Sequence, residues 1–206
     1  ACCDILRPEL PEAVAAGGFC AVTAHAVLDL LPVAPTLARL RSLLSPGGQL
    51  YATLNYDGLT TLLPPEAPGG FEQRLLAEYD RSMERRRAAG PGSRALLPTG
   101  GAHSGRRLYA AAAGCGFRVL AAGPSDWSLF PYSGRYSPAE RVFLRTMLGF
   151  IAAEGARQPR LASDELRRWL TRRLAQVRVG TLALVVHQLD LLLQRTERAD
   201  RAPKGR

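Results

Sequence analysis

The sequence predicts an α/β protein, and three consecutive segments carry that prediction. FCAVTAHAVLDLLP, from Phe19, opens with the β-branched and apolar residues of a buried strand. VAPTLARLRSLLSPGGQ has leucines at helical spacing, and QLYATLNYDG is again strand-like. Strand, helix, turn and strand form one βαβ unit with two parallel strands. Its crossover should be right-handed, so that the helix covers one face of the sheet.

The helix of this unit should bury one leucine stripe. Leu37, Leu40, Leu43 and Leu44 recur at helical spacing, and the Pro-Gly-Gly at 46–48 is expected to end the helix. The strand that follows has near-continuous apolar character, which is typical of a parallel strand covered on both faces.

Residues 57–102 interrupt the α/β pattern. Two loop clusters, LLPPEAPGG and AAGPGSRALLPTGG, flank a helix expected near FEQRLLAEYDRSMERRRA. An insertion after the carboxyl end of a strand is placed to cover a site. The pattern resumes with a helix that opens at Ser104 as N-cap, followed by a strand at 117–123.

The last third contains two further helices and a strand. Ser137 as N-cap, Pro138 and Glu140 form a capping-box signature for a helix to about Ala153. A second helix should open at 163–165, bury a stripe that includes Trp169, and end at Gly180. TLALVVH then supplies a strand, and the charged tail at 195–206 is expected to be disordered.

Composition indicates one globular domain. The chain has 206 residues and is 47% hydrophobic, and its most apolar stretch, 181–193, is broken by His187, Gln188 and Asp190, so no membrane helix is expected. Four cysteines, at 2, 3, 20 and 115, match neither a zinc site nor a disulfide framework. We therefore expect reduced thiols in the cytoplasm. The first residue is Ala, which suggests a cut rather than an export signal.

The net charge of +9 comes almost wholly from arginine, with Lys204 as the single lysine. A nucleic-acid surface would gather basic residues on one face with interleaved aromatics. The arginines here are instead scattered over several expected helices. This distribution favours solvated helix faces, and we do not expect a nucleic-acid partner.

The chain resembles the carboxyl-terminal two-thirds of class I S-adenosylmethionine-dependent methyltransferases. FCAVTAHAVLDLLP is similar to the family's fourth strand, and LLSPGGQLYATLNYDG to its turn and fifth strand. GCGFRVLAAGPSDWSLF is similar to the sixth strand and the loop after it, and VGTLALVVHQLDLLL to the antiparallel seventh strand. The resemblance implies a Rossmann-like methyltransferase sheet, mostly parallel with a reversed last strand, whose first strands are absent from this chain. Residues 1–194 would form a partial methyltransferase domain with 57–102 as its substrate-side insertion.

Two departures limit what the resemblance implies. Cys20 stands where the family has Asp at the start of its fourth strand, and the family's opening strand and Gly-x-Gly-x-Gly turn have no counterpart. That turn lets the backbone approach the cofactor. GCG at 114–116 is better explained as a helix end, PGG as a turn, and GGAHSG at 100–105 follows no expected strand. We therefore expect an incomplete cofactor site.

Four residues remain as candidates for contact with S-adenosylmethionine. By resemblance, Asp4 and Ile5 would meet the adenine ring, and the alternative is an ordinary loop aspartate. Ala24 and His25 would lie against the methionine part and the reacting methyl. His25 is also a candidate catalytic base, since imidazole exchanges protons near neutral pH. A capping or merely exposed histidine is the alternative.

Substrate contact is predicted for the end of the second strand of the βαβ unit. Asn55, Tyr56 and Asp57 lie there, although Asn and Asp-Gly also form turns. Trp127 is a candidate pocket wall, or alternatively a core residue at the sheet edge. His103 and His187 have no partners at metal-ligand spacing, so no metal is assigned.

Two functions remain open from the sequence. The first is a methyltransferase for a small-molecule acceptor, of which this chain is an incomplete, inactive part. The second is a non-catalytic, methyltransferase-like binding protein that docks a partner or nucleic acid. In either case the first strand would be an open sheet edge, which a missing amino-terminal segment or an oligomeric partner must cover.

Overall fold

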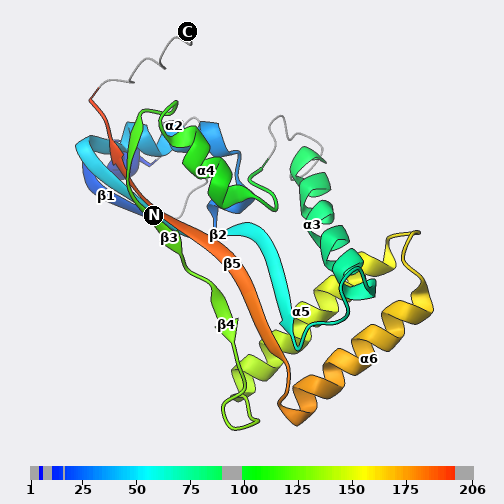
Figure 1. Cartoon of the computed structure of the whole chain (residues 1–206). Helices are drawn as coiled ribbons and strands as arrows, with labels where there is room; N and C mark the ends of the chain where they lie inside the picture. The colour runs from blue at the N-terminus through cyan, green and yellow to red at the C-terminus, as the bar shows by residue number, and fades with distance from the viewer. Residues whose placement is uncertain (1–4, 7–10, 16, 90–98, 198–206) are drawn as a thin grey trace. The chain divides into compact units, whose positions relative to one another are not determined.

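The computed structural model describes residues 5–6, 11–15, 17–89 and 99–197. Its elements in chain order are α1 (Glu12–Ala15), β1 (Phe19–His25), the 3-10 helix η1 (Leu28–Leu30), α2 (Val33–Leu43), β2 (Leu44–Leu63), α3 (Phe71–Ala89), α4 (Ser104–Ala112), β3 (Phe117–Pro124), β4 (Trp127–Leu129), α5 (Pro138–Ala156), α6 (Ser163–Val179) and β5 (Ala183–Arg195) (Figure 1). They fall into two compact units. The first comprises 1–57, 86–125 and 188–206, and the second 58–85 and 126–187.

The strands form a mixed sheet in which the last strand is reversed. The strand order is β1-β2-β5-β3, with β1 parallel to β2 and β3 antiparallel to β5. The last strand in sequence, β5, therefore lies between β2 and β3. The predicted α/β class and the predicted reversal of the last strand are both confirmed.

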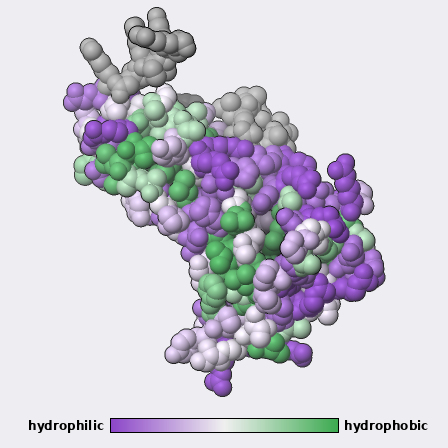
Figure 2. Space-filling view, in the orientation of Figure 1, coloured by the Kyte–Doolittle hydropathy of each residue, from purple (hydrophilic) through white to green (hydrophobic). Residues whose placement is uncertain are grey.

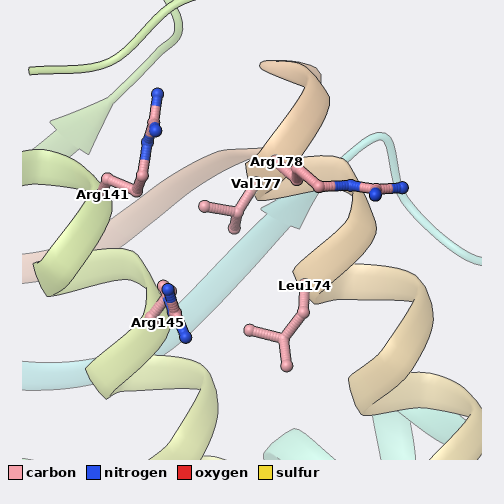
Figure 3. Close-up of a pocket in the computed structure, with 5 residues that line it drawn as sticks. All are labelled: Arg141, Arg145, Leu174, Val177 and Arg178. Atoms are coloured by element: carbon pink, nitrogen blue, oxygen red, sulfur yellow. The ribbon is translucent and has the colours of Figure 1, made fainter.

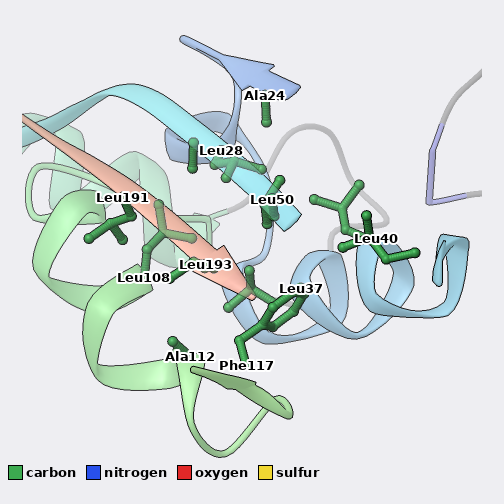
Figure 4. Close-up of a cluster of buried hydrophobic side chains, with 12 residues drawn as sticks. Ala24, Leu28, Leu37, Leu40, Leu50, Leu108, Ala112, Phe117, Leu191 and Leu193 are labelled. Atoms are coloured by element: carbon green, nitrogen blue, oxygen red, sulfur yellow. The ribbon is translucent and has the colours of Figure 1, made fainter. Parts of the chain in front are cut away.

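The core of the first unit lies between its strands and two helices, α2 and α4, which pack against each other. Leu37 and Leu40 of α2, Leu108 of α4 and Leu50 of β2 meet in this core (Figure 4). Tyr51, the next residue of β2, points to the opposite face and is 44% exposed. Within the described residues, β2 is thus more deeply buried on one face than on the other, whereas its apolar sequence predicted burial on both.

The Pro-Gly-Gly segment lies inside β2, which corrects the prediction that it forms a turn after the helix. Helix α2 ends at Leu43 and β2 begins at Leu44, paired with Phe19 of β1. A Cβ atom at Gly48 would lie 2.9 Å from the Phe19 carbonyl oxygen, so this position needs glycine for the two strands to approach. At its other end β2 continues to Leu63, beyond the predicted strand.

Helix α4 begins as predicted, but Ser104 is not its N-cap. The N-cap position is His103, whose side chain makes no capping hydrogen bond. The Ser104 hydroxyl donates instead to the Tyr56 carbonyl oxygen at 2.8 Å. Asp57, from β2, takes over the capping role by accepting a hydrogen bond from the Arg106 backbone N–H at 2.8 Å.

The second unit contains the helix signals that the sequence predicted for the last third. Ser137 and Glu140 form both halves of the capping box of α5, with Pro138 at its first position. Gly180 ends α6 in the left-handed conformation, at φ 71. The unit also has one strand that the sequence did not predict, β4, which pairs antiparallel with residues 184–186 of β5.

A buried polar cluster joins α3 to α6 in the second unit. Glu72 accepts hydrogen bonds from Trp169 Nε1 and Arg173 Nε, both at 2.7 Å, and from Arg173 Nη2 at 2.5 Å. Arg173 is 1% exposed. It also donates to the Pro64 carbonyl oxygen and to Gln176. Apolar side chains of α5 and α6, among them Leu144, Leu148 and Leu166, are buried in the same unit.

Hydrophilic side chains cover much of the face shown in Figure 2, with smaller apolar areas among them. Exposed apolar residues include Tyr132, Val142 and Phe150. Within the described part of the chain, every helix is too short or too polar to cross a bilayer.

Candidate functional site

The carboxyl end of β1 lies beside the middle of β2 in the first unit. His25, the last residue of β1, is in register with Thr53 of β2. The residue that follows each of these two is in the left-handed region, Ala26 at φ 50 and Leu54 at φ 58. Residues other than glycine adopt this conformation infrequently, and surrounding contacts must hold them in it. Such residues are common at functional sites.

One such contact is a carboxylate from the last strand. Asp190 Oδ1 accepts a hydrogen bond from the Leu54 backbone N–H at 2.8 Å and another from the Ser125 hydroxyl at 2.5 Å. Asp190 was not among the predicted site residues. The sequence signal that could have found it is an acidic residue in the apolar run LDLLL of a strand expected to be buried.

The His25 ring is held at the tip of β1 by two contacts. Nδ1 lies 2.5 Å from the Thr53 hydroxyl, and the ring meets Tyr51 edge-on at a centroid distance of 6.1 Å. Within the described residues, Nε2 has no hydrogen-bond partner. This geometry orients the imidazole and leaves one ring nitrogen available for a hydrogen bond to a bound molecule.

A cavity of about 650 Å³ lies beside β1, entirely within the first unit. Its volume is within the range of small-molecule sites, roughly 300–1,000 Å³. Three of the four predicted cofactor contacts line it: Ile5, Ala24 and His25. Arg39 of α2 holds the loop that carries Ile5 by donating to the Ile5 carbonyl oxygen at 3.3 Å. The fourth predicted contact, Asp4, lies outside the described residues.

The wall of this cavity is mainly apolar. Val22, Leu28, Leu31, Leu40 and Leu43 contribute to it, together with the hydroxyl-bearing Thr36 of α2. The Thr36 hydroxyl is buried and has no hydrogen-bond partner within the described residues. Such a wall suits a flat apolar ring or an alkyl group, with one hydroxyl free to pair with a polar atom of a ligand.

The predicted substrate residues Asn55, Tyr56 and Asp57 lie inside β2, which continues to Leu63, and not at a strand end as predicted. Asn55 and Asp57 are bound to neighbouring elements. Asn55 is fully buried, and its side-chain N–H donates to the Leu189 carbonyl oxygen at 2.9 Å. Its Oδ1 has no partner within the described residues. The Asp57 carboxylate, 6% exposed, also accepts from Arg106 Nε at 3.1 Å. Tyr56 is half-buried and lies between these two residues.

Trp127, the remaining predicted substrate contact, belongs to the second unit. It is 38% exposed and meets Phe143 of α5 edge-on, with ring centroids 5.2 Å apart. Within the first unit the structure gathers Ile5, Ala24 and His25 around one cavity and places Asn55, Tyr56 and Asp57 next to one another inside β2. The role predicted for each residue remains a prediction.

The described residues contain no group of three or more His, Cys, Asp or Glu side chains that could hold a metal ion. His187 instead pairs with Asp126, at 2.8 Å between Nδ1 and Oδ1. The described cysteines, Cys20 and Cys115, are free thiols, and burial raises the pKa of Cys115.

Asp29, in η1 next to this site, is a further residue that the sequence did not single out. Its Oδ1 is buried with no hydrogen-bond partner within the described residues, and desolvation raises its pKa above the usual aspartate value. The folded chain therefore holds the Asp29 proton more tightly than the unfolded chain. The resulting stabilisation is present at low pH and is lost as pH rises through the folded-state pKa.

We accordingly expect Asp29→Asn, which cannot ionise, to be more stable than the parent chain at pH 7. Near pH 3 the two chains should have nearly equal stability, because the carboxyl is then protonated in both folded and unfolded states. Urea midpoints at the two pH values measure this difference. A lower midpoint for the variant at pH 7 would contradict the expected direction.

Comparison with known proteins gives a limited result. No protein family matches the chain, and no curated protein matches it. Solved structures do match, and three of the most similar are the [4+2]-cyclase SpnF, a presumed methyltransferase (BH2331) from Bacillus halodurans, and phosphoethanolamine N-methyltransferase 2 from Haemonchus contortus in complex with phosphomonomethylethanolamine and S-adenosylhomocysteine.

These matches are distant. Sequence identities are 16%, 13% and 13%, and TM-scores are 0.38, 0.45 and 0.38, respectively. The matched regions cover 95%, 94% and 95% of this chain, but 55%, 69% and 36% of the three structures. The chain thus spans about half the length of the first of these proteins. At this level of similarity the matches by themselves define no activity.

Proposed function

We propose that this chain is part of an S-adenosylmethionine-dependent methyltransferase that acts on a small-molecule acceptor. The observation that carries the proposal is the cavity beside β1, lined by three of the residues that the sequence resemblance associates with the cofactor: Ile5, Ala24 and His25. The reversed last strand, between β2 and β3, supports it as well, because it is the sheet ending that the resemblance implies.

The residues present fit part of the cofactor. The apolar wall and Ile5 suit the adenine ring, and Ala24, a small residue at the tip of β1, leaves room for the methionine part. The ribose hydroxyls of the cofactor need a carboxylate as hydrogen-bond partner. Its methionine end needs a glycine-rich turn whose backbone can approach closely, and this turn is not in the sequence. When bound, the cofactor supplies an electrophilic methyl group.

For methyl transfer the protein has to position the acceptor and exclude water, more than to supply acid or base. His25 is suited to accept the acceptor's proton at Nε2, since Thr53 fixes the ring through Nδ1. Asn55 Oδ1 is unpaired within the described chain, but Asn55 is fully buried and does not line the cavity, so the proposed contact with the acceptor requires a local rearrangement. The proposal includes the predicted cytoplasmic location.

Calorimetric titration with S-adenosylmethionine tests the proposal. The 206-residue chain should bind weakly, with a dissociation constant of about 1 mM or higher, and should have little or no activity, because it supplies only part of the site. The same chain extended by the residues encoded in frame upstream should bind at least about a hundredfold more tightly. Ala24→Leu, which fills the cavity at the tip of β1, should abolish this gain in affinity. Ala139→Leu, at an exposed position of α5, is the matched control.

Two results would overturn different parts of the proposal. Micromolar binding by the 206-residue chain would refute the claim that its part of the site is insufficient. An upstream sequence without a glycine-rich turn, together with no binding by either chain, would favour the second candidate, a non-catalytic binding protein. The observation that favours this candidate is the position of β1 at the edge of the sheet, where another chain could pair with it.

A further inference from the structure

The second unit contains a small cavity between helices α5 and α6 that the proposed methyl transfer does not use. Its volume is about 280 Å³, and it is lined by Arg141 and Arg145 of α5 and by Leu174, Val177 and Arg178 of α6. Leu174 and Val177 point from α6 toward α5 and form an apolar floor (Figure 3). Arg141 and Arg145 project from the facing helix.

The arginines of this cavity differ from most others in the same unit. Arg157, Arg168, Arg172 and Arg173 each pair with an acidic side chain within 4 Å. In the part of the chain that the structure describes, the guanidinium groups of the three cavity arginines have neither an acidic partner nor a hydrogen bond. Three exposed arginines without an acidic partner in the described chain therefore border an apolar floor.

Two of these cations are placed where a helix disfavours them. Arg141 and Arg145 are four residues apart, so like charges face each other on one side of α5. Arg141 also lies in the first turns of α5, near the positive end of the helix dipole. Both effects raise the positive potential at the mouth of the cavity, and a bound anion would relieve both. Arg178 is different, because it lies in the last turn of α6, where the dipole favours a cation.

The direction of each side chain sets its contribution. In Figure 3 the Arg178 head group points away from α5, whereas its stem borders the cavity beside Val177. Arg141 and Arg145 are exposed at the mouth, and their flexible side chains can turn onto a ligand. The α5 pair should therefore contribute most of the binding, and Arg178 less.

We propose that this cavity binds a small anionic amphiphile, with a phosphate or carboxylate head group held by Arg141 and Arg145 and a short apolar body on Leu174 and Val177. The planar guanidinium group matches both kinds of head group. The volume of about 280 Å³ is slightly below the usual range for ligand sites, which limits the apolar body to a few carbon atoms. The proposal does not depend on S-adenosylmethionine binding.

Calorimetric titration of the full 206-residue chain with hexyl phosphate tests it, with inorganic phosphate and 1-hexanol as comparison probes. Hexyl phosphate should bind more tightly than either. The double variant R141Q/R145Q should bind it about tenfold or more weakly, since hydrogen bonds to charged groups contribute on that order, whereas R178Q should cause a smaller loss. Leu174→Ala should weaken hexyl phosphate but not inorganic phosphate.

The control variant R160Q/R167Q removes two exposed arginines from the same unit, and therefore the same net charge, outside the cavity. It should bind hexyl phosphate as the parent does, and thermal melting should show that all variants are folded. Equal losses in the two double variants would mean general charge attraction and would overturn the proposal. Hexanol binding as tight as hexyl phosphate binding would overturn it too. The proposal would also be overturned if the parent chain bound phosphatidylserine vesicles but not hexyl phosphate, because the arginines would then bind a membrane surface and not a small ligand.

Discussion

Replacing Arg173 with Met should lower the free energy of unfolding by roughly 3–5 kcal/mol, the loss expected when one partner of a buried ion pair is removed. Arg173 is almost completely buried, and its guanidinium group donates two hydrogen bonds to Glu72. Without it, Glu72 keeps the Trp169 indole N–H as a partner but retains a buried charge without a cation. Urea denaturation followed by tryptophan fluorescence measures the loss.

The neighbouring residue provides a matched control for this experiment. Arg172 lies on the same helix and pairs with Glu66, but its side chain is about half exposed. Arg172→Met should cost less than about 1 kcal/mol, because exposed ion pairs contribute little. The double variant E72Q/R173M should recover much of the loss, since a neutral Gln can still accept from Trp169. If R172M and R173M cost the same, the buried pair does not have the role assigned to it.

Asp57→Ala should destabilise the chain by about 2–3 kcal/mol. The Asp57 carboxylate caps α4 by accepting from the Arg106 backbone N–H, and this bond joins β2 to the start of that helix. Loss of a helix cap costs about 0.5–2 kcal/mol, and loss of a hydrogen bond to a charged group about 1.5–3 kcal/mol. The two ranges describe overlapping contributions, so they do not add. The Arg106 guanidinium is exposed and should contribute little.

Asp57→Asn separates the two roles considered for this residue, which are capping of α4 and contact with a substrate. Asn keeps an oxygen that can accept from the Arg106 N–H, so we expect it to recover about half of the stability lost in D57A. Asp164→Ala, which removes an exposed carboxylate at the start of α6, should cost less than about 1 kcal/mol. A loss below about 0.5 kcal/mol in D57A would show that Asp57 is not needed for the fold, and would favour the predicted substrate contact.

Much of the element order could be predicted because it rests on short-range signals. The capping box of Ser137 and Glu140 spans four residues, and Gly180 ends α6 through its own backbone conformation. The tip of β1 could be predicted in the same way, and with it the positions of Ala24 and His25. Ser104 shows the limit, because a serine before a helix predicts a local cap that a distant carboxylate provides instead.

The contacts that shape the candidate site connect residues far apart in the sequence. Asp190 holds the backbone of Leu54 across 136 positions, and Asp57 meets Arg106 across 49. Arg173 reaches Glu72 across 101 positions. No local pattern encodes such pairs, since a buried carboxylate is tolerated wherever the fold brings a donor to it.

The sequence by itself determined the α/β class, the reversed last strand through its resemblance, and the residues at the tip of β1, because strand and helix periodicity and end signals are local. It did not determine the end of β2, which continues past Asp57 to Leu63. Tertiary structure alone decided that Ile5, Ala24 and His25 line one cavity and that Asp57 caps α4. It alone also decided that two arginines of α5, unpaired within the described residues, line a second cavity together with apolar side chains of α6. The physical reason is that burial and pairing depend on which surfaces the folded chain brings together, and this is fixed by packing over the whole unit.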